Sequence, residues 1–309
     1  MKDFFSDLAL DERDRNISGG GNEKGYNVSE RTKEGVKITR VKVTSLDGEK
    51  ALNREKGLYS TVEIEDFAVP EEDFPSVVRV IADEISDIAK LKEGDSVLVV
   101  GLGNDLITPD SLGPLVLKKT IVTRHLKQNA PSLYFSENMR EVSGIVPGVL
   151  GQTGLESFEI TESVVKRIKP DAVLLIDSLA ARNLERLTKA IQISDRGLIP
   201  GGGVGNSRAE ISESTLGVKC ISVGVPTVVS AESLVSDVIS SALERKSMSD
   251  ITADELLKNS LSPFEASLIV TPKDIRQIIS QCARLLGYAV NCALHSDLDC
   301  DSISDWLNA

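Results

Sequence analysis

The sequence has few aromatic residues and no excess of basic charge, and both shortages exclude a class of function. Phe, Trp and Tyr make up 4% of the 309 residues, too few for the stacking platforms that bind single-stranded nucleic acid. The formal net charge is -12, whereas a surface that binds phosphates usually has a basic excess. We therefore expect no direct nucleic-acid partner.

The sequence also lacks the usual zinc-protease and serine-protease motifs. It contains 2 histidines, His125 and His295, with no H-E-x-x-H spacing and no G-x-S-x-G turn around a serine. The 4 cysteines (Cys220, Cys282, Cys292 and Cys300) include no C-x-x-C pair, so we expect free thiols.

Long apolar runs are absent as well. No segment is apolar over the length that a bilayer requires, and the first residues, MKDFFSDLALDERDR, are acidic where a secretory signal would have an apolar core. We therefore expect a cytoplasmic protein with no membrane partner.

The first 35 residues differ in character from the rest of the chain. They carry many charges and three consecutive glycines, which predicts a loosely ordered arm with one amphipathic piece at Phe4–Leu10. Residues 36–309 are predicted to form a single α/β domain. It opens with two alternating segments, Val36–Ser45 and Leu58–Glu65, which are typical of an antiparallel ribbon.

Helical and buried-strand patterns then alternate along the chain. Helices are predicted at residues 76–91, 109–127, 155–168, 231–245 and 272–294, and buried strands at 96–101, 172–177 and 219–224. This order predicts a mostly parallel central sheet with helices on both faces.

Two carboxylates stand at the ends of the predicted buried strands. Asp110 follows the turn GLGNDLITP, in the first turn of a predicted helix, and Asp177 ends the apolar run AVLLID. Ligands of open α/β sheets bind beyond the carboxyl ends of the strands. Each acid also has a purely structural interpretation, because acidic residues are favoured in the first turn and at the N-cap of a helix.

If the two strands are neighbours, the carboxylates face each other. Two like charges ~4 Å apart repel by about 4 kcal/mol at an effective dielectric constant of ~20, so one of the two would hold a proton. Such a pair supplies a base to activate water and an acid to protonate a leaving group, as amide hydrolysis requires.

Two glycine-rich segments allow other interpretations. GLGNDL begins like a dinucleotide fingerprint, but Leu106 occupies the position of the third glycine. PGGGVGNSRAE, at residues 200–210, lacks the Gly-Lys-Ser/Thr of a phosphate loop and suggests a loop beside the site. His295 could complete a metal site with the two aspartates, or could simply end a helix.

Six segments together resemble the germination protease family of spore-forming bacteria. They are GLGNDLITPDSLGP, PGVLGQTGLE, IDSLAAR, GGGVGNSR, SVGVPTVV and LIVTPKDI, in the family's order over nearly the whole chain. The resemblance implies a three-layer α/β/α sandwich like that of hydrogenase maturation proteases. It also implies an endopeptidase that degrades small acid-soluble DNA-binding spore proteins and has two essential acids, here Asp110 and Asp177.

The resemblance implies further a homotetramer in the forespore and spore core, made as a zymogen. No cofactor is expected, although a metal-assisted scheme stays open beside an aspartate-only one, and so does a non-hydrolytic nucleotide-binding domain at the GLGN turn. The family's precursor trims itself after an acid, an apolar residue and alanine. Ser6-Asp7-Leu8-Ala9-Leu10 fits this pattern, so residues 1–9 are predicted to be a propeptide, cut between Ala9 and Leu10 and followed by the arm at 10–35.

Two positions depart from the pattern expected of the family. Ser230 stands where an aspartate is expected, and Ser178 stands where alanine is commoner. Neither position is one of the two acids.

Overall fold

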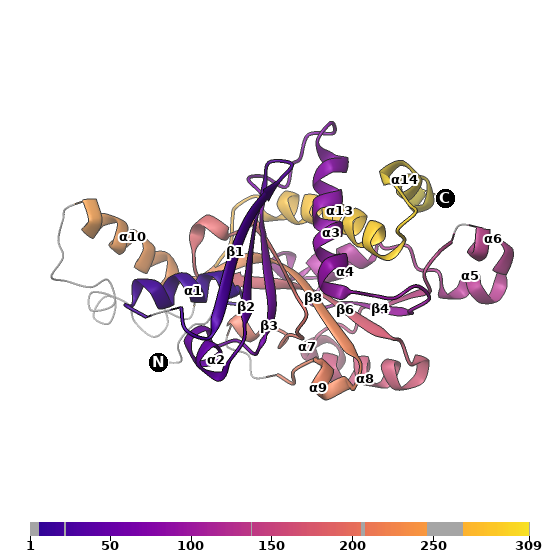
Figure 1. Cartoon of the computed structure of the whole chain (residues 1–309), viewed down its shortest axis with the longest axis horizontal. Coiled ribbons are helices and arrows are strands. Elements are labelled where there is room, and N and C mark those ends of the chain that lie inside the picture. The colour runs from indigo at the N-terminus through magenta and orange to yellow at the C-terminus, as the bar shows by residue number, and fades with distance from the viewer. Residues whose placement is uncertain (1–5, 22, 137, 205–207, 246–267, 309) are drawn as a thin grey trace.

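A nine-stranded mixed sheet forms the centre of the computed structural model, which describes residues 6–21, 23–136, 138–204, 208–245 and 268–308 (Figure 1). The strand order is β1-β2-β3-β7-β8-β6-β4-β5, with β9 paired to β8. The strands are β1 (Tyr26–Lys33), β2 (Val36–Val43), β3 (Gly57–Glu63), β4 (Val97–Gly101), β5 (Val142–Ile145), β6 (Ala172–Ala181), β7 (Ala190–Ser194), β8 (Lys219–Ser230) and β9 (Ile269–Val270).

Helices precede, connect and follow these strands. The α-helices are α1 (Ala9–Ser18), α2 (Leu46–Leu52), α3 (Phe74–Ala89), α4 (Leu112–Leu117), α5 (Arg124–Asn129), α6 (Pro131–Ser136), α7 (Leu150–Thr153), α8 (Ser157–Ile168), α9 (Glu213–Leu216), α10 (Ala231–Arg245), α13 (Ile275–Leu294) and α14 (Cys300–Asn308). The described residues also form three short 3-10 helices, η1 (Thr108–Asp110), η2 (Leu184–Arg186) and η3 (Gly202–Val204). Within the described ranges, no helix is both long and apolar enough to cross a membrane.

The centre of the sheet is parallel, as the alternation of strands and helices predicts. β8, β6, β4 and β5 run parallel to one another, and β7 then pairs antiparallel with both β8 and β3. The predicted antiparallel ribbon is also confirmed, because β3 and β2 pair antiparallel and extend the same sheet. The α/β fold class predicted from the sequence is therefore correct.

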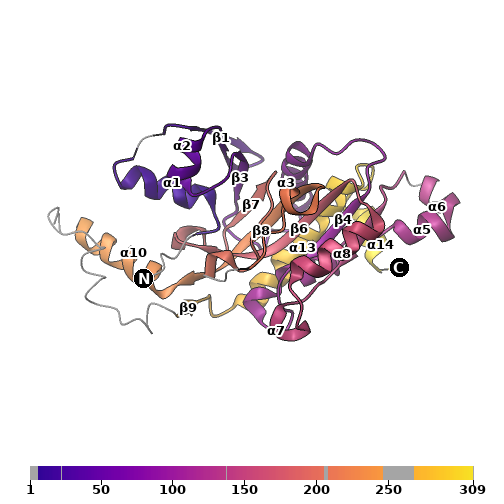
Figure 2. The ribbon, with the colours of Figure 1, turned by 90° about the horizontal axis from the view of Figure 1, so that it is seen from below.

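Both faces of the parallel strands are covered, which explains their uninterrupted apolar sequences. Val97 and Val99 of β4 belong to the large core beneath α3 and α13, whereas Leu98 and Val100 belong to a second core beneath α8. Figure 1 shows α3 and α13 on one side of the sheet and α8 on the other, and Figure 2 shows α10 and α6 at opposite ends of the molecule.

A buried carboxylate ties the ribbon to α3. Glu84 is fully buried and accepts hydrogen bonds from Arg40 (Nη2 to Oε1, 2.8 Å) and from the Ser60 hydroxyl (2.7 Å), and it also pairs with Arg31. Because a buried charge is stable only when it is paired, these contacts fix the position of α3 on the ribbon.

In place of the loosely ordered arm predicted for residues 10–35, the structure has α1 and β1. Only Tyr26 is buried on β1, because this strand lies at the edge of the sheet and its charged side chains face solvent. Its order comes from pairing with β2 over 8 residues, a tertiary contact that leaves no apolar alternation in the sequence. Residues 4 and 5 of the predicted amphipathic piece lie outside the described residues.

The helix predicted over residues 109–127 is broken into η1, α4 and α5. The side chain of Asn291 on α13 accepts a hydrogen bond from the Ile121 amide (2.8 Å) and donates one to the Lys119 carbonyl (2.8 Å). These two hydrogen bonds hold the backbone between α4 and α5 in a non-helical conformation, so a tertiary interaction overrides the local helical pattern. The other predicted helices are present, with ends that differ by a few residues.

Candidate active site

Asp177 lies inside β6, beside the point where the neighbouring strand β4 ends. Gly101, the last residue of β4, pairs with Ile176, and β6 continues for four residues beyond Asp177 along β8, with a shift of register between Leu179 and Ala180. The predicted strand therefore ends too early, at Asp177. The side chain is still in the predicted crevice, because β4 has already ended there, and it is 4% exposed.

The GLGN turn after β4 holds Asp110. The amide of Asn104 donates to both the carbonyl oxygen (3.0 Å) and the carboxylate (2.9 Å) of Asp110. Gly103 has a φ of 109°, and a Cβ there would lie 2.1 Å from the Asp110 carbonyl oxygen. The glycine is required because only it combines this backbone conformation with so close an approach. The turn thus positions a carboxylate, and no phosphate is needed to explain its glycines.

Close packing brings the two acids to one place. The amide of Leu102 donates to the Ile176 carbonyl (2.8 Å), and a Cβ on Gly113 in α4 would lie 2.4 Å from that same carbonyl oxygen. The Thr227 hydroxyl of β8 donates to the Pro109 carbonyl (2.7 Å) and fixes η1 against the sheet. The segments that carry Asp110 and Asp177 are therefore packed directly against each other.

The protonation of the two carboxyl groups is coupled. Burial raises the pKa of Asp177 well above its usual value, and the negative charges of Asp110 and Asp7 raise it further. Burial raises the pKa of Asp110 to about 6, opposed by the Asn104 amide and the positive charge of Arg208. Burial therefore favours the protonated form of both carboxyl groups, and ionisation of Asp110 opposes ionisation of Asp177.

The glycine-rich segment at residues 200–210 lies beside these acids, as predicted. Gly202 and Gly203 line the same cavity as Asp177, and Arg208 interacts electrostatically with Asp110 while its Nη1 lies 3.7 Å from Glu156. Residues 205–207 of this segment lie outside the described residues. The segment therefore contributes a close backbone approach at Gly203 and a cation at Arg208.

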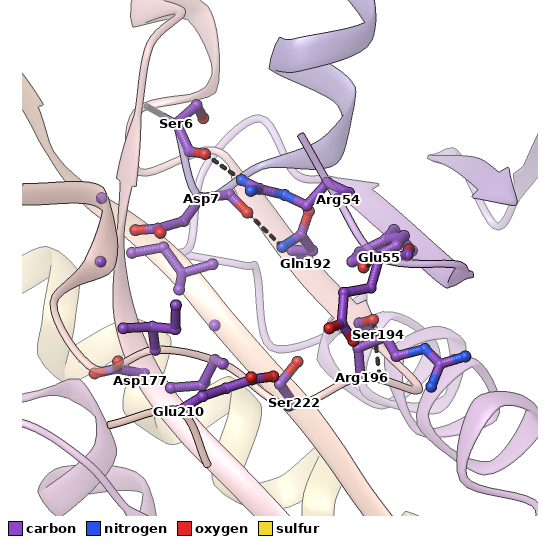
Figure 3. A pocket seen from close by; sticks show the side chains of 18 of the residues that line it. Ser6, Asp7, Arg54, Glu55, Asp177, Gln192, Ser194, Arg196, Glu210 and Ser222 are labelled. Carbon is purple, nitrogen blue, oxygen red and sulfur yellow. Dashed lines mark hydrogen bonds between the residues drawn. The ribbon is translucent and has the colours of Figure 1, made fainter. Parts of the chain in front are cut away.

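A cavity of about 330 Å³ opens next to Asp177 and contains the start of the described chain. Ser6 and Asp7 of the arm line it together with Asp177, Gln192 and Arg54. Figure 3 shows Asp7 and Asp177 along one side of the cavity, and Gln192 and Arg54 along the other. The predicted propeptide thus enters the crevice that holds one of the two predicted catalytic acids.

The predicted cleavage site, Ala9 and Leu10, lies at the start of α1. Both residues are buried, at 0% and 2% exposure, and pack against the ribbon and α2 in one apolar cluster with Tyr26, Val41, Val43, Leu52 and Tyr59. The Ala9 amide donates to the side chain of Gln192 (2.7 Å). The bond between them is therefore inside the molecule in this state.

Sequence reasoning missed three residues of the cavity, namely Gln192, Arg54 and Gly203. Gln192 left a signal, because it is a polar residue within the apolar segment AIQIS of a buried strand. Arg54 donates a hydrogen bond to the Ser6 carbonyl but looks like any other surface arginine in the sequence. Gly203 is one of four glycines in its segment, and only the structure distinguishes it from the others.

His295 does not join the aspartates. The Thr271 hydroxyl, just before α13, donates to the Thr227 carbonyl near η1, whereas His295 follows the other end of this 20-residue helix, roughly 30 Å away at 1.5 Å per residue. Burial lowers the pKa of His295 to about 4, and its Nε2 lies 3.2 Å from the Ile121 carbonyl. It therefore ends a helix as a buried neutral imidazole.

Among the described residues, no group of three or more His, Cys, Asp or Glu side chains is arranged to hold a metal ion. The four cysteines are free, and three of them are buried, as expected. Ser230 caps α10 by accepting a hydrogen bond from the Ser233 amide (2.9 Å), so its hydroxyl has a structural role at this position.

Residues 6–250 match a family model described as Germination protease. The chain belongs to the germination protease family. It is thus a peptidase, a hydrolase that acts on peptide bonds. The match begins at Ser6, the first residue that the structure describes.

Named relatives of the germination protease family match over nearly their whole length. The Germination protease of Caldanaerobacter subterraneus subsp. tengcongensis is 42% identical over 95% of this chain and 94% of the relative. That of Clostridium tetani is 38% identical over 98% of this chain and 99% of the relative. A solved structure, the [NiFe] hydrogenase maturation protease HycI from Thermococcus kodakarensis KOD1, matches 67% of this chain and 98% of its own at 16% identity and a TM-score of 0.35, a likeness too low to carry an argument.

Proposed function

We propose that this protein is the endopeptidase that initiates degradation of small acid-soluble DNA-binding spore proteins during germination, with Asp110 and Asp177 as its catalytic residues. The observation that carries the proposal is the pairing of a buried carboxyl group, Asp177, with a partly buried one, Asp110, beyond the end of β4 in a chain of the germination protease family; both have raised pKa values. Raised pKa values in such a pair are what a general acid and a general base require.

The two acids have different roles in this proposal. Asp110, with a pKa of about 6, is ionised at neutral pH and accepts a proton from the attacking water. Asp177, whose pKa burial raises well above its usual value, is protonated and donates to the leaving amine. Arg208 keeps Asp110 ionised through its positive charge. After the products leave, proton exchange between the two acids and solvent restores the starting state.

The same proposal includes a precursor that loses residues 1–9 by a cut between Ala9 and Leu10. Its support is the position of Asp7 in the cavity beside Asp177, where it would obstruct a substrate. Because the bond to be cut lies in the first turn of α1, that turn must unwind before the bond can reach the acids. The folded part that remains begins with the rest of α1 and includes the domain at residues 36–309.

The family resemblance also supports a homotetramer located in the forespore and the spore core. Sedimentation equilibrium of the purified protein tests the first of these, and a fluorescent fusion followed through sporulation tests the second. A monomer at micromolar concentration, or a signal confined to the mother cell, would contradict them.

The experiment that tests the proposed function uses the protein trimmed of residues 1–9. It is incubated with a small acid-soluble spore protein, and the products are identified by mass. Cleavage after an acid-apolar-alanine segment is expected, and Asp110→Asn and Asp177→Asn should each lower the rate by about 10²–10⁴-fold, the usual contribution of a general acid or base. Full activity of both variants would contradict the roles of the acids.

A chelator control separates the aspartate-only scheme from the metal-assisted one. Activity that is unchanged by the chelator supports the aspartate-only scheme. Activity that is lost and then restored by one added metal would assign the same two carboxylates as metal ligands.

A further inference from the structure

Three consecutive residues of the predicted propeptide, Asp7, Leu8 and Ala9, are bound by three different parts of the folded body. These residues are the acid, the apolar residue and the alanine that precede the predicted cut. Each of them makes a specific contact with β6, β7 or the loop at Gly203. The contacts together describe a site for this type of segment.

Main-chain amides receive the acidic side chain. Oδ2 of Asp7 accepts a hydrogen bond from the Ala180 amide (2.8 Å). Burial raises the pKa of Asp7, and the Ala180 amide, the charge of Arg54 and the Gly203 amide oppose this effect. A Cβ on Gly203 would lie 2.2 Å from this carboxylate oxygen. Glycine at 203 therefore leaves space for a carboxylate, and backbone amides in such an arrangement bind anions.

An apolar pocket receives the next residue. Leu8 is fully buried in a cluster with Leu179 and Ala181 of β6, Ala190 of β7 and Val229 of β8. These small and branched side chains line a space that fits one aliphatic side chain. A polar side chain in this space would be desolvated without a hydrogen-bond partner.

Gln192 holds the main chain on either side of Leu8. Its Nε2 donates to the Asp7 carbonyl (2.7 Å) and its Oε1 accepts from the Ala9 amide (2.7 Å). On the other side, the Asp7 amide donates to the Ala180 carbonyl (2.9 Å). The main chain of the segment is thus held by hydrogen bonds, as in an extended peptide bound to a protein. The amides at Ala180 and Gly203 bind its acidic side chain, and the apolar pocket binds Leu8.

The site adjoins the catalytic acids without placing the bond between them. Asp177 and Gln192 both pair with Gly224 of β8, so they stand two strand spacings apart, about 10 Å. The bond after Ala9 is held near Gln192 by α1, on the far side of Gly224 from Asp177. The arm therefore fills the site in a form that does not react.

We propose that the site filled by Asp7–Ala9 is the substrate-recognition site of the trimmed protein, in which Ala180 and Gly203 bind an acidic side chain, the pocket at Leu179 binds an apolar one, and Gln192 binds the main chain between them. The inference rests on the proposed function. It takes the acid-apolar-alanine cleavage sequence from that function, and it adds which residues of the folded body bind the acid, the apolar side chain and the main chain.

A first test uses the full chain. Gly203→Ala places a methyl group against the Asp7 carboxylate and the Ala180 side chain, whereas Gly151→Ala, on the exposed helix α7, is a control, because a Cβ there has nothing within 4 Å. Amide hydrogen exchange of residues 6–12 should become at least tenfold faster in Gly203→Ala and stay unchanged in Gly151→Ala. Equal exchange in the two variants would overturn the contact.

The decisive test uses the trimmed protein, whose cooperative thermal unfolding is checked first. The substrates are a fluorogenic peptide with the sequence of residues 3–14 and the same peptide with Asp7→Asn. The peptide change and the Gly203→Ala change should each lower kcat/KM by about tenfold, and the two together should cost little more than either alone, because both remove one contact. The Gly151→Ala protein should prefer the acidic peptide as strongly as the unmodified protein does.

Gln192→Met provides a second variant that keeps the volume and removes both hydrogen bonds. It should raise KM by about tenfold for both peptides with little change in kcat, and Gln277→Met on the exposed side of α13 is its control. Two results together would contradict the proposed recognition site without contradicting the proposed function. They are additive losses of kcat/KM for Gly203→Ala and the Asp7→Asn peptide, and an unchanged KM in Gln192→Met. A trimmed wild-type protein that cleaves neither peptide nor spore protein would overturn the proposed function itself, and with it the site.

Discussion

Asp177 and Gln192 face one cavity from the two strands that flank Gly224. The Leu179 side chain packs over Gly224 between them, and only glycine leaves room for it, since a Cβ there would lie 2.6 Å from the Cγ of Leu179. One strand thus presents a buried carboxyl group to the cavity, and the other presents an amide side chain that binds the main chain of Asp7 and Ala9.

The pH dependence of cleavage should show an acid limb near pH 6. Asp110 acts as a base only when it is ionised, and burial raises its pKa to about 6. kcat/KM of the trimmed protein should therefore fall about tenfold for each unit below this pH. Burial is the main cause of this pKa, and the Asn104 amide and the positive charge of Arg208 oppose it. A limb near pH 4 would show that Asp110 is not the base.

Replacing Asp110 should stabilise the folded protein in a pH-dependent way. Its folded pKa of about 6 lies above the ordinary value of 3.8, so the ionised form is disfavoured in the native state. The penalty is absent below pH 3.8, grows between 3.8 and 6, and is complete above pH 6, where it amounts to about 3 kcal/mol at ~1.4 kcal/mol for each pKa unit.

The measurement is urea unfolding of wild type and Asp110→Asn at pH 8 and pH 4. The variant should be more stable at pH 8, by up to about 3 kcal/mol, and equal to wild type at pH 4. Asn can still accept the hydrogen bond from Asn104, so little else changes. Asp105→Asn is the matched control on the same turn, since Asp105 is exposed. Equal stability at pH 8 would show that burial does not perturb Asp110.

The sequence predicted the features that depend on local pattern. The apolar strands, the ribbon and the two acids at the end of β4 followed from periodicity and strand-end reasoning. Features that depend on contacts distant in the sequence could not be predicted. Asn291 interrupts a helix 170 residues away, β1 is ordered by its pairing with β2, and Gln192 acquires its role only because the arm lies against it.

Arg208 should set the position of the acid limb. Its charge lowers the pKa of Asp110, so Arg208→Gln should raise that pKa and move the acid limb of kcat/KM to a pH above 6. The loss of activity should then be several-fold larger at pH 6 than at pH 8. Arg196→Gln is the control, because Arg196 lines the cavity beside Asp195 and does not act on Asp110. An equal loss at both pH values would assign Arg208 to a merely structural role.

The remainder of α1 should stay attached after the cut. Arg186 pairs with Asp11 (2.6 Å) and Asp14 (2.6 Å), and Asp11 also accepts hydrogen bonds from the Arg182 and Asn183 amides. Asp11 and Asp14 lie after the predicted cut, so these contacts survive it. Arg186→Met removes the cation and leaves the buried Asp11 with backbone donors only.

We expect Arg186→Met to destabilise the trimmed protein by about 2–3 kcal/mol, somewhat less than the usual cost of breaking a buried pair, because those donors remain. Amide exchange within α1 should rise in parallel. Arg13→Met is the control, since Arg13 pairs with the exposed Glu23 and should cost less than about 1 kcal/mol. Unchanged protection of α1 in Arg186→Met would show that apolar packing of Leu10 on the ribbon is enough to hold this helix in place.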